Sequence, residues 1–195
     1  MRKQKLAAIC AVSLTVLAMA GCSSTSDVAA PTFADVDAAA VAMQAKYTDA
    51  NGDLLVGVDR ASGAEINSAA NATYTGYVGG DVAGSTLVGT LEVAADFTAL
   101  TTASSATGFI HETDGDYAGT LSGAGVIAPS APLLAPQIST TVAGTLVNGG
   151  VNYATSLALD GQFVENAADP VGAIAGTADG VVGTDLLIGT FAAEK

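Results

Sequence analysis

The stretch "YAGTLSGAGVI", residues 117–127, combines strand-forming residues with glycines at positions 119, 123 and 125. Glycine weakens a strand interior, because it has more backbone freedom to lose and no side chain to pack. The fragment nevertheless recurs: "GTL" begins at residues 89, 119 and 144, and "GTF" begins at residue 189. Glycine must therefore serve the fold at these places.

Each of these glycines has a large apolar residue two positions away on both sides. Tyr117 and Leu121 flank Gly119 in this way. The same arrangement surrounds four further glycines: Gly76, Gly89, Gly144 and Gly189. Since residues i and i+2 of a strand share a face, the glycines lie on the apolar face. A small barrel curves strongly, and glycine permits bends where inward side chains would collide. The glycines thus predict inward-facing bends in a barrel wall.

Alternation of apolar and polar residues with a period of two runs through the second part of the chain. In "LVGTLEVAADF", for example, Leu91 and Val93 fall on one face, and Glu92 and Asp96 fall on the other. Eight such runs are expected, over residues 72–80, 87–97, 102–112, 116–128, 137–148, 151–163, 170–178 and 181–192. The segments "TDGD", "NGG", "NAADP" and "ADG" have the composition of turns between them.

No run after residue 47 has a helical period, so consecutive strands should pair as antiparallel hairpins. Closing the sheet removes its two open edges. The sequence therefore predicts an all-β fold, an eight-stranded antiparallel up-and-down β-barrel preceded by one short α-helix. The outward positions carry Thr, Ser, Ala, Asp and Glu, whereas a membrane-spanning barrel needs an apolar outer face.

The preceding helix is expected over about residues 33–47. Five apolar residues spaced three or four apart share one helical face: Phe33, Val36, Ala40, Met43 and Tyr47. Thr32 can cap the first turn, with Asp35 three residues later. We expect this face to pack against the barrel; the alternative is a stripe that binds a partner.

The N-terminus has the three parts of a secretory signal: basic "MRKQK", the apolar run "LAAICAVSLTVLA", and small residues up to Cys22. The apolar run is shorter than the roughly 20 residues that span a bilayer. The ending "LAMAGC" resembles a bacterial lipobox. It predicts a lipoprotein signal peptide over residues 1–21 and lipid attachment at Cys22; ordinary cleavage after small residues is the alternative.

The rest of the chain divides into a tether (22–31), the N-terminal helix (32–48), a connector (49–71) and the β-barrel domain (72–195). The connector could hold a short extra strand at residues 54–60. Three of the six basic residues fall in the signal, so 19 acids face three bases, a net charge of −16. Such a surface repels nucleic acid and anionic lipid head groups, and it suits a basic partner or a cationic ligand.

No residue pattern indicates an enzyme, a metal site or a cofactor. "GAGVIA" (123–128) fits a dinucleotide fingerprint, but no helix can follow it. "DANGDLLVGVDR" (49–60) begins like a calcium loop but lacks the required Gly and Glu, which predicts a solvated turn. His111 is the only histidine, and no G-x-S-x-G elbow accompanies it. We therefore expect His111 to be a wall residue.

Four segments carry a resemblance to a known family: "ATYTGYVGG", "VAADF", "VGAIAG" and the ending "LLIGTFAAEK". Over residues 72–195 the chain resembles the β-barrel domain of the transferrin-binding protein B family of surface lipoproteins. The resemblance implies an outer-membrane lipid anchor, the cell surface rather than the periplasmic face, an outer-membrane export protein as partner, and capture of proteins or haem compounds. This chain has one barrel, no handle domain and few lysines, and no transferrin-contacting residue carries over.

Two functions are consistent with the sequence. The first is an outer-membrane, lipid-anchored binding protein that presents loops to a protein or small ligand. The second is a structural envelope lipoprotein with no specific ligand. For the binding protein, the turns "TDGD" and "NAADP" place Asp114, Asp116 and Asp169 where a partner could reach them. A barrel interior with room for a ligand would favour internal binding, whereas a packed interior would leave the loops.

We predict that Cys22 carries acyl chains. The intact mass of the protein isolated from cell envelopes should correspond to a chain that begins at Cys22 plus lipid, because stable anchoring takes two or more lipid chains. Recovery of the chain without added mass, free in the periplasm, would contradict the lipobox.

Overall fold

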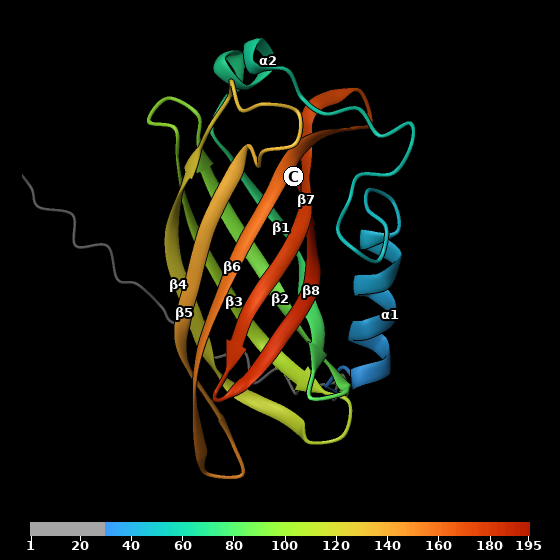
Figure 1. Cartoon of the computed structure of the whole chain (residues 1–195), viewed down its shortest axis with the longest axis vertical. Coiled ribbons are helices and arrows are strands. Elements are labelled where there is room, and N and C mark those ends of the chain that lie inside the picture. The colour runs from blue at the N-terminus through green and yellow to red at the C-terminus, as the bar shows by residue number, and fades with distance from the viewer. Residues whose placement is uncertain (1–29) are drawn as a thin grey trace, which may run out of the picture. The chain divides into compact units, whose positions relative to one another are not determined.

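The computed structural model describes residues 30–195, so the predicted signal peptide and Cys22 lie outside the described residues. Eight antiparallel strands close into one barrel in the order of the chain, which confirms the predicted fold class (Figure 1). The strands are β1 (Ala72–Val82), β2 (Ser85–Asp96), β3 (Thr101–His111), β4 (Gly115–Ile127), β5 (Ile138–Asn148), β6 (Val151–Asn166), β7 (Asp169–Val182) and β8 (Asp185–Glu194).

Two features of the sequence were interpreted wrongly. The predicted turn "ADG" lies inside β7, where Asp179 and Gly180 pair with residues of β6, and the chain reverses at Gly183 instead. Gly180 is required there because a Cβ atom would collide with the Ser156 carbonyl of β6. Residues 54–60 form no strand; the segment makes only isolated bridges at its two ends.

Large side chains fill the barrel interior. Phe163, near the end of β6, is fully buried; its ring centroid lies 5.2 Å from that of Phe97 and 5.9 Å from that of Tyr74. Other fully buried side chains are Phe109, Phe191, Leu87, Leu121, Ile138, Leu146, Leu157, Leu159 and Ile174. This agrees with an eight-stranded barrel, whose interior is just wide enough for side chains. The interior therefore serves as the hydrophobic core.

The apolar residues that flank the repeated glycines are all buried, as predicted, although Gly119 itself is exposed. At Gly89 the reason is a β-bulge, in which Gly108 and Phe109 together oppose one residue of β2. A Cβ atom on Gly89 would lie 2.6 Å from the Phe109 ring. Glycine here makes room for an aromatic residue of the core.

At Gly119 the reason differs from the expected collision across the barrel. Ala118 and Gly119 together oppose Gly108, which forms a second bulge, and Gly119 has a φ of +132°. An added Cβ atom would meet the carbonyl oxygen of Thr145 on the adjacent strand β5. Both the backbone conformation and the close approach of β5 therefore require glycine at this bend.

The strands alternate in direction, so the connections gather at two ends. The four short turns at residues 83–84, 112–114, 149–150 and 183–184 form what we term the hairpin end, which is lowest in Figure 1. The opposite end, termed the α2 end, holds the short helix α2 (Gly63–Ser68) and the C-terminus. It also holds the connections at 97–100 and 128–137, which are longer, and the two-residue turn at 167–168.

Helix α2 closes its end of the barrel. Ser62 caps it and Glu65 completes the capping box, a signal that the sequence analysis overlooked. Ile66 is fully buried in the core cluster, and Ala61 belongs to the same cluster. Gln137 donates a hydrogen bond of 2.7 Å to the Ala61 carbonyl. This part of the connector thus belongs to the barrel core.

Helix α1 (Phe33–Gln44) packs on the outer wall of the barrel, which excludes the alternative of a free partner-binding stripe. It begins at the hairpin end, where Phe33 and Val36 pack near Val88 and Ile110. Its last residues approach the α2 end (Figure 1). The Thr32–Asp35 capping box is present as predicted. Among residues 30–195 no helix is long and apolar enough to cross a membrane.

A polar clasp fastens the C-terminal end of α1 to β8. The Tyr47 hydroxyl donates to Glu194 Oε1 at 2.5 Å, and the Lys46 ammonium lies 2.9 Å from the same oxygen. Burial opposes ionisation of Glu194, but the bonds from Tyr47 and Lys46 hold the pKa of its carboxyl below the ordinary value. The ionised carboxylate therefore stabilises the docked helix.

Replacing Gly119 by Val should lower the free energy of unfolding by roughly 1–3 kcal/mol, although Val favours strands. The side chain would meet β5 in a backbone conformation that it resists. The control Thr120→Val, at the next exposed position of β4, should change the stability by less than about 0.5 kcal/mol. Urea unfolding measures both, and equal stability of the two variants would exclude the described bulge.

Replacing Glu194 by Gln should cost about 1–3 kcal/mol at pH 7, because a charged acceptor for two donors is lost. The folded-state pKa of Glu194 is depressed, so its stabilisation is complete above 4.5, the ordinary value, and is lost as the pH falls through the folded value. The stability difference from the parent should therefore shrink in acid. Unfolding is followed from pH 7 to pH 3, with the exposed Glu165→Gln as control. A stability difference between Glu194→Gln and the parent that stayed constant over this range would contradict the clasp.

Candidate functional site

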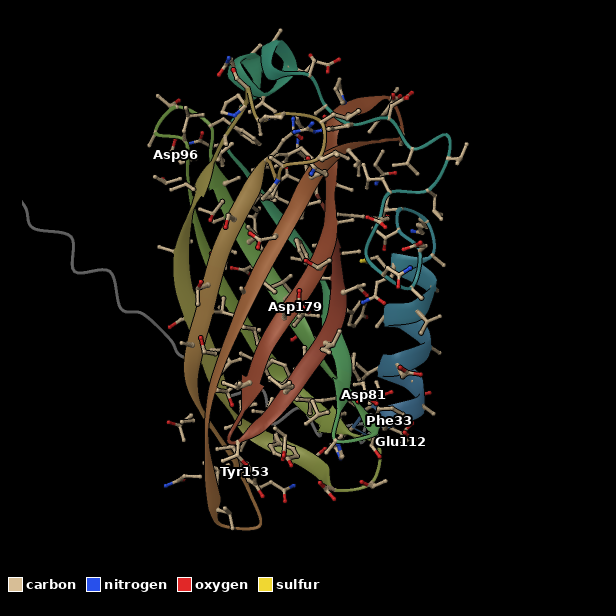
Figure 2. All side chains as sticks on the ribbon, viewed as in Figure 1. Phe33, Asp81, Asp96, Glu112, Tyr153 and Asp179 are labelled. Carbon is tan, nitrogen blue, oxygen red and sulfur yellow. The ribbon has the colours of Figure 1, made fainter. Side chains whose placement is uncertain are left out.

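The hairpin end carries only acidic charge. Five carboxylates lie on or beside its turns: Asp81, Glu112, Asp114, Asp116 and Asp185. Figure 2 labels Asp81 and Glu112 at this end. The three basic residues of the described chain lie elsewhere: Lys46 binds Glu194, Lys195 binds Asp169, and Arg60 binds the 128–137 loop. Nothing of opposite charge therefore neutralises the hairpin end within residues 30–195.

A hollow of about 240 Å³ opens at this end of the barrel. Val82 and Val182, both almost fully buried, belong to its lining. Tyr117, Tyr153 and His111 contribute aromatic rings. The carboxylates of its lining are Asp114 and Asp185. The hollow is smaller than the 300–1,000 Å³ that is usual for drug-sized ligands, so it suits a group the size of one side chain.

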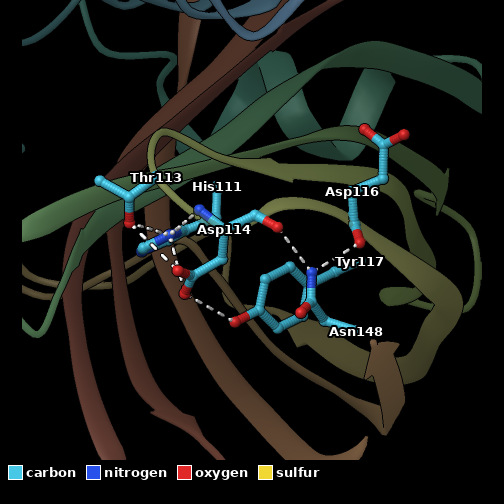
Figure 3. Close-up of polar contacts among 6 residues, drawn as sticks. All are labelled: His111, Thr113, Asp114, Asp116, Tyr117 and Asn148. Carbon is cyan, nitrogen blue, oxygen red and sulfur yellow. Dashed lines mark hydrogen bonds and ion pairs between the residues drawn. The ribbon is translucent and has the colours of Figure 1, made fainter. Parts of the chain in front are cut away.

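Asp114 is held in place by three neighbours (Figure 3). Its Oδ2 lies 3.2 Å from His111 Nδ1 and accepts a 3.4 Å hydrogen bond from the Tyr117 hydroxyl. Its Oδ1 accepts a 3.2 Å bond from Thr113. The side chain is still 53% exposed, and a carboxylate has about four acceptor positions, so it can bind a further donor.

His111 lies at the end of β3 and faces inward, which makes it the wall residue that the sequence predicted. It is only 7% exposed. The Thr113 hydroxyl lies 3.2 Å from its Nδ1, and the backbone N–H of Asp114 donates to the same atom at 3.3 Å. Its Nε2 has no hydrogen-bond partner among the described residues, and the ring lines the hollow.

The two tyrosines form the aromatic side of the hollow. The ring centroids of Tyr117 and Tyr153 are 5.2 Å apart, and the planes are inclined by 58°. Burial raises the pKa of Tyr117 to about 12, and the nearby Asp114 carboxylate adds to this effect. Tyr117 therefore remains a neutral donor to that carboxylate at physiological pH. Tyr153 packs against the turn at Gly183.

Asn148 fixes the β3–β4 turn from the neighbouring strand. Its side-chain amide donates to the carbonyls of Asp114 (2.9 Å) and Asp116 (3.0 Å), as Figure 3 shows. Two carbonyls of one turn thus share one donor group, which limits movement of the turn. The carboxylate beside it is therefore presented on a fixed backbone.

The three predicted contact residues do not form one site. Asp114 and Asp116 lie at the hairpin end, but Asp169 begins β7 at the α2 end. Asp169 binds the Lys195 ammonium at 2.8 Å and the Val171 N–H at 3.0 Å. The Lys195 bond lowers the pKa of Asp169. This carboxylate is thus engaged within the chain, at the opposite end of the barrel from the other two.

A larger groove of about 730 Å³ lies on the outer wall near the α2 end. Leu133 and Leu134 of the 128–137 loop border it and are strongly exposed. Arg60 clamps the loop by donating to the carbonyls at residues 131, 132 and 135. The groove is of mixed character, since the carboxylates of Asp53, Asp59 and Asp160 also belong to its lining.

The other motifs take their expected structural roles. Asp49 accepts the backbone N–H groups of Asn51 and Asp53, as in a solvated turn. "GAGVIA" lies mostly in β4, and no helix follows it. Among residues 30–195 no three His, Cys, Asp or Glu side chains come together in a way that could hold a metal ion.

Comparison of the chain with known protein families, curated proteins and solved structures finds no match in any of the three. Function must therefore be inferred from the geometry of the hairpin end. Carboxylates, aromatic faces and a free imidazole nitrogen can together bind a cationic group, since each attracts positive charge or accepts an N–H bond.

Proposed function

We propose that this protein is an outer-membrane, lipid-anchored binding protein of the transferrin-binding protein B type, whose hairpin end contacts a basic partner. The single observation that carries the binding role is the acidic, unneutralised hairpin end with its preformed hollow. The lipid anchor rests on the lipobox that ends at Cys22.

Packing supports a role for the surface loops. The interior is occupied by core side chains, and the apolar face of α1 is turned to the barrel wall. The turns remain as contact surface, and those of the hairpin end carry charge of one sign. Complementary charge of this kind steers a partner and acts mainly on the association rate.

The contact can be located with a photoreactive amino acid placed at one end of the barrel at a time. Thr184 in the β7–β8 turn reports on the hairpin end, and Leu134 reports on the α2 end. In intact cells we expect an adduct with one defined basic protein from position 184 and none from position 134. Adducts from position 134 alone would move the site to the groove, and none from either would favour a structural envelope lipoprotein.

The double change Asp114→Asn with Asp116→Asn should slow association with that partner several-fold at low salt, while the thermal melt stays unchanged. The difference should fade at physiological salt, where the Debye length is about 8 Å. Asp179→Asn, on the outer wall (Figure 2), is the matched control. An association rate that depends neither on the salt concentration nor on the double change would contradict electrostatic contact at this end.

A further inference from the structure

The hollow at the hairpin end differs from a simple acidic surface. Acidic turns attract any basic protein, but the hollow adds two aromatic rings and a nearly buried histidine with a free ring nitrogen. Together with Asp185, these groups converge from four strands: β3, β4, β6 and β8. Such convergence suits insertion of one particular side chain.

We propose that the hollow receives an arginine side chain of the basic partner, an inference that rests on the proposed binding function. A guanidinium group is planar, stays charged, stacks on aromatic faces and can donate two parallel bonds to a carboxylate. Tyr117 and Tyr153 supply the faces, and Asp114 supplies the carboxylate.

Asp114 is preorganised for this role. Thr113 and Tyr117 already donate to its two oxygens, and Asn148 holds the backbone of its turn. Binding therefore need not order a mobile carboxylate, which removes part of the entropic cost of association. The exposed half of the carboxylate still has free acceptor positions.

His111 can complete an all-acceptor lining. Its Nδ1 lies 3.2 Å from Asp114 Oδ2, so a proton on Nδ1 can be donated to the carboxylate. The lone pair then resides on Nε2, which can accept an N–H bond from the guanidinium group. The bound cation selects this tautomer over the one in which Nδ1 accepts the Asp114 backbone N–H.

The size of the hollow is consistent with one side chain. Its 240 Å³ is too small for a peptide segment, and Val82 and Val182 offer apolar contact to a methylene stem. Asp185 lines the hollow from the start of β8 and adds a second carboxylate. An arginine could thus bury its stem and keep its charged group beside the acids.

The test titrates the mature lipidated protein, held in detergent, with N-acetyl-arginine amide. Its neutral analogue, N-acetyl-citrulline amide, serves as the control ligand. Ring resonances of His111, Tyr117 and Tyr153 in NMR spectra report on the hollow. We expect saturable shifts with the arginine compound and about tenfold weaker binding of the citrulline compound, as expected for loss of a charged pair.

Matched variants separate the hollow from general charge. Asp114→Asn should weaken arginine binding roughly tenfold, whereas Asp116→Asn, near the start of β4 but outside the hollow, should change it less than about twofold. Tyr153→Leu should weaken it about threefold through loss of the ring, while Tyr153→Phe should not. Thermal melts confirm that each variant is folded.

Equal binding of the two compounds, or equal effects of Asp114→Asn and Asp116→Asn, would overturn the arginine site. The partner contact is judged separately, by the adduct from position 184. An intact adduct without arginine binding would leave the proposed function standing and remove the hollow from it. Arginine binding without any adduct would retain the site and remove the protein partner.

Discussion

The fold depends on one geometric constraint: the interior of an eight-stranded barrel has room for side chains and for little else. Phe163 fills the part of it near the α2 end, in contact with rings from β1 and from the turn after β2. Where a large inward residue needs more room, a glycine can provide it, as Gly89 does for Phe109. Glycine at such a position is thus part of the core packing.

A filled interior moves function to the outside. Core side chains occupy the space in which other barrels hold a ligand. Contacts with a partner must therefore be made by the two ends of the barrel or by its outer wall. The two ends are built differently. The α2 end is closed by a helix and by bonds from Arg60, Gln137 and Lys195. The hairpin end is closed only by short turns, and the hollow lies among them.

Most of the barrel could be predicted because alternation with a period of two is a local signal, which every strand carries in its own residues. The exceptions have local causes. Asp179 and Gly180 have turn composition, but Gly180 serves the close approach of β6. Helix α2 is too short to show a helical period, although Ser62 and Glu65 carry its capping signal.

The site was only partly predictable, since a site joins residues from separate strands. Asp114 and Asp116 were found from turn composition. Counting turns would have separated them from Asp169, because successive turns of an up-and-down barrel lie at alternate ends. Tyr153 and Asp185 could not be assigned to the hollow from sequence, since their convergence depends on the stagger of the strands around the barrel.

The starting point of α1 has a consequence for where a partner can be met. Phe33 lies beside the acidic turns (Figure 2), so a lipid anchor at Cys22 would attach the barrel to the membrane from its hairpin end. Ten residues can span at most roughly 35 Å. The hollow would then stay within a few nanometres of the lipid head groups, and it would meet partners only in this thin layer. A partner in the same membrane would be met at a high effective concentration, so even a weak contact could be well occupied.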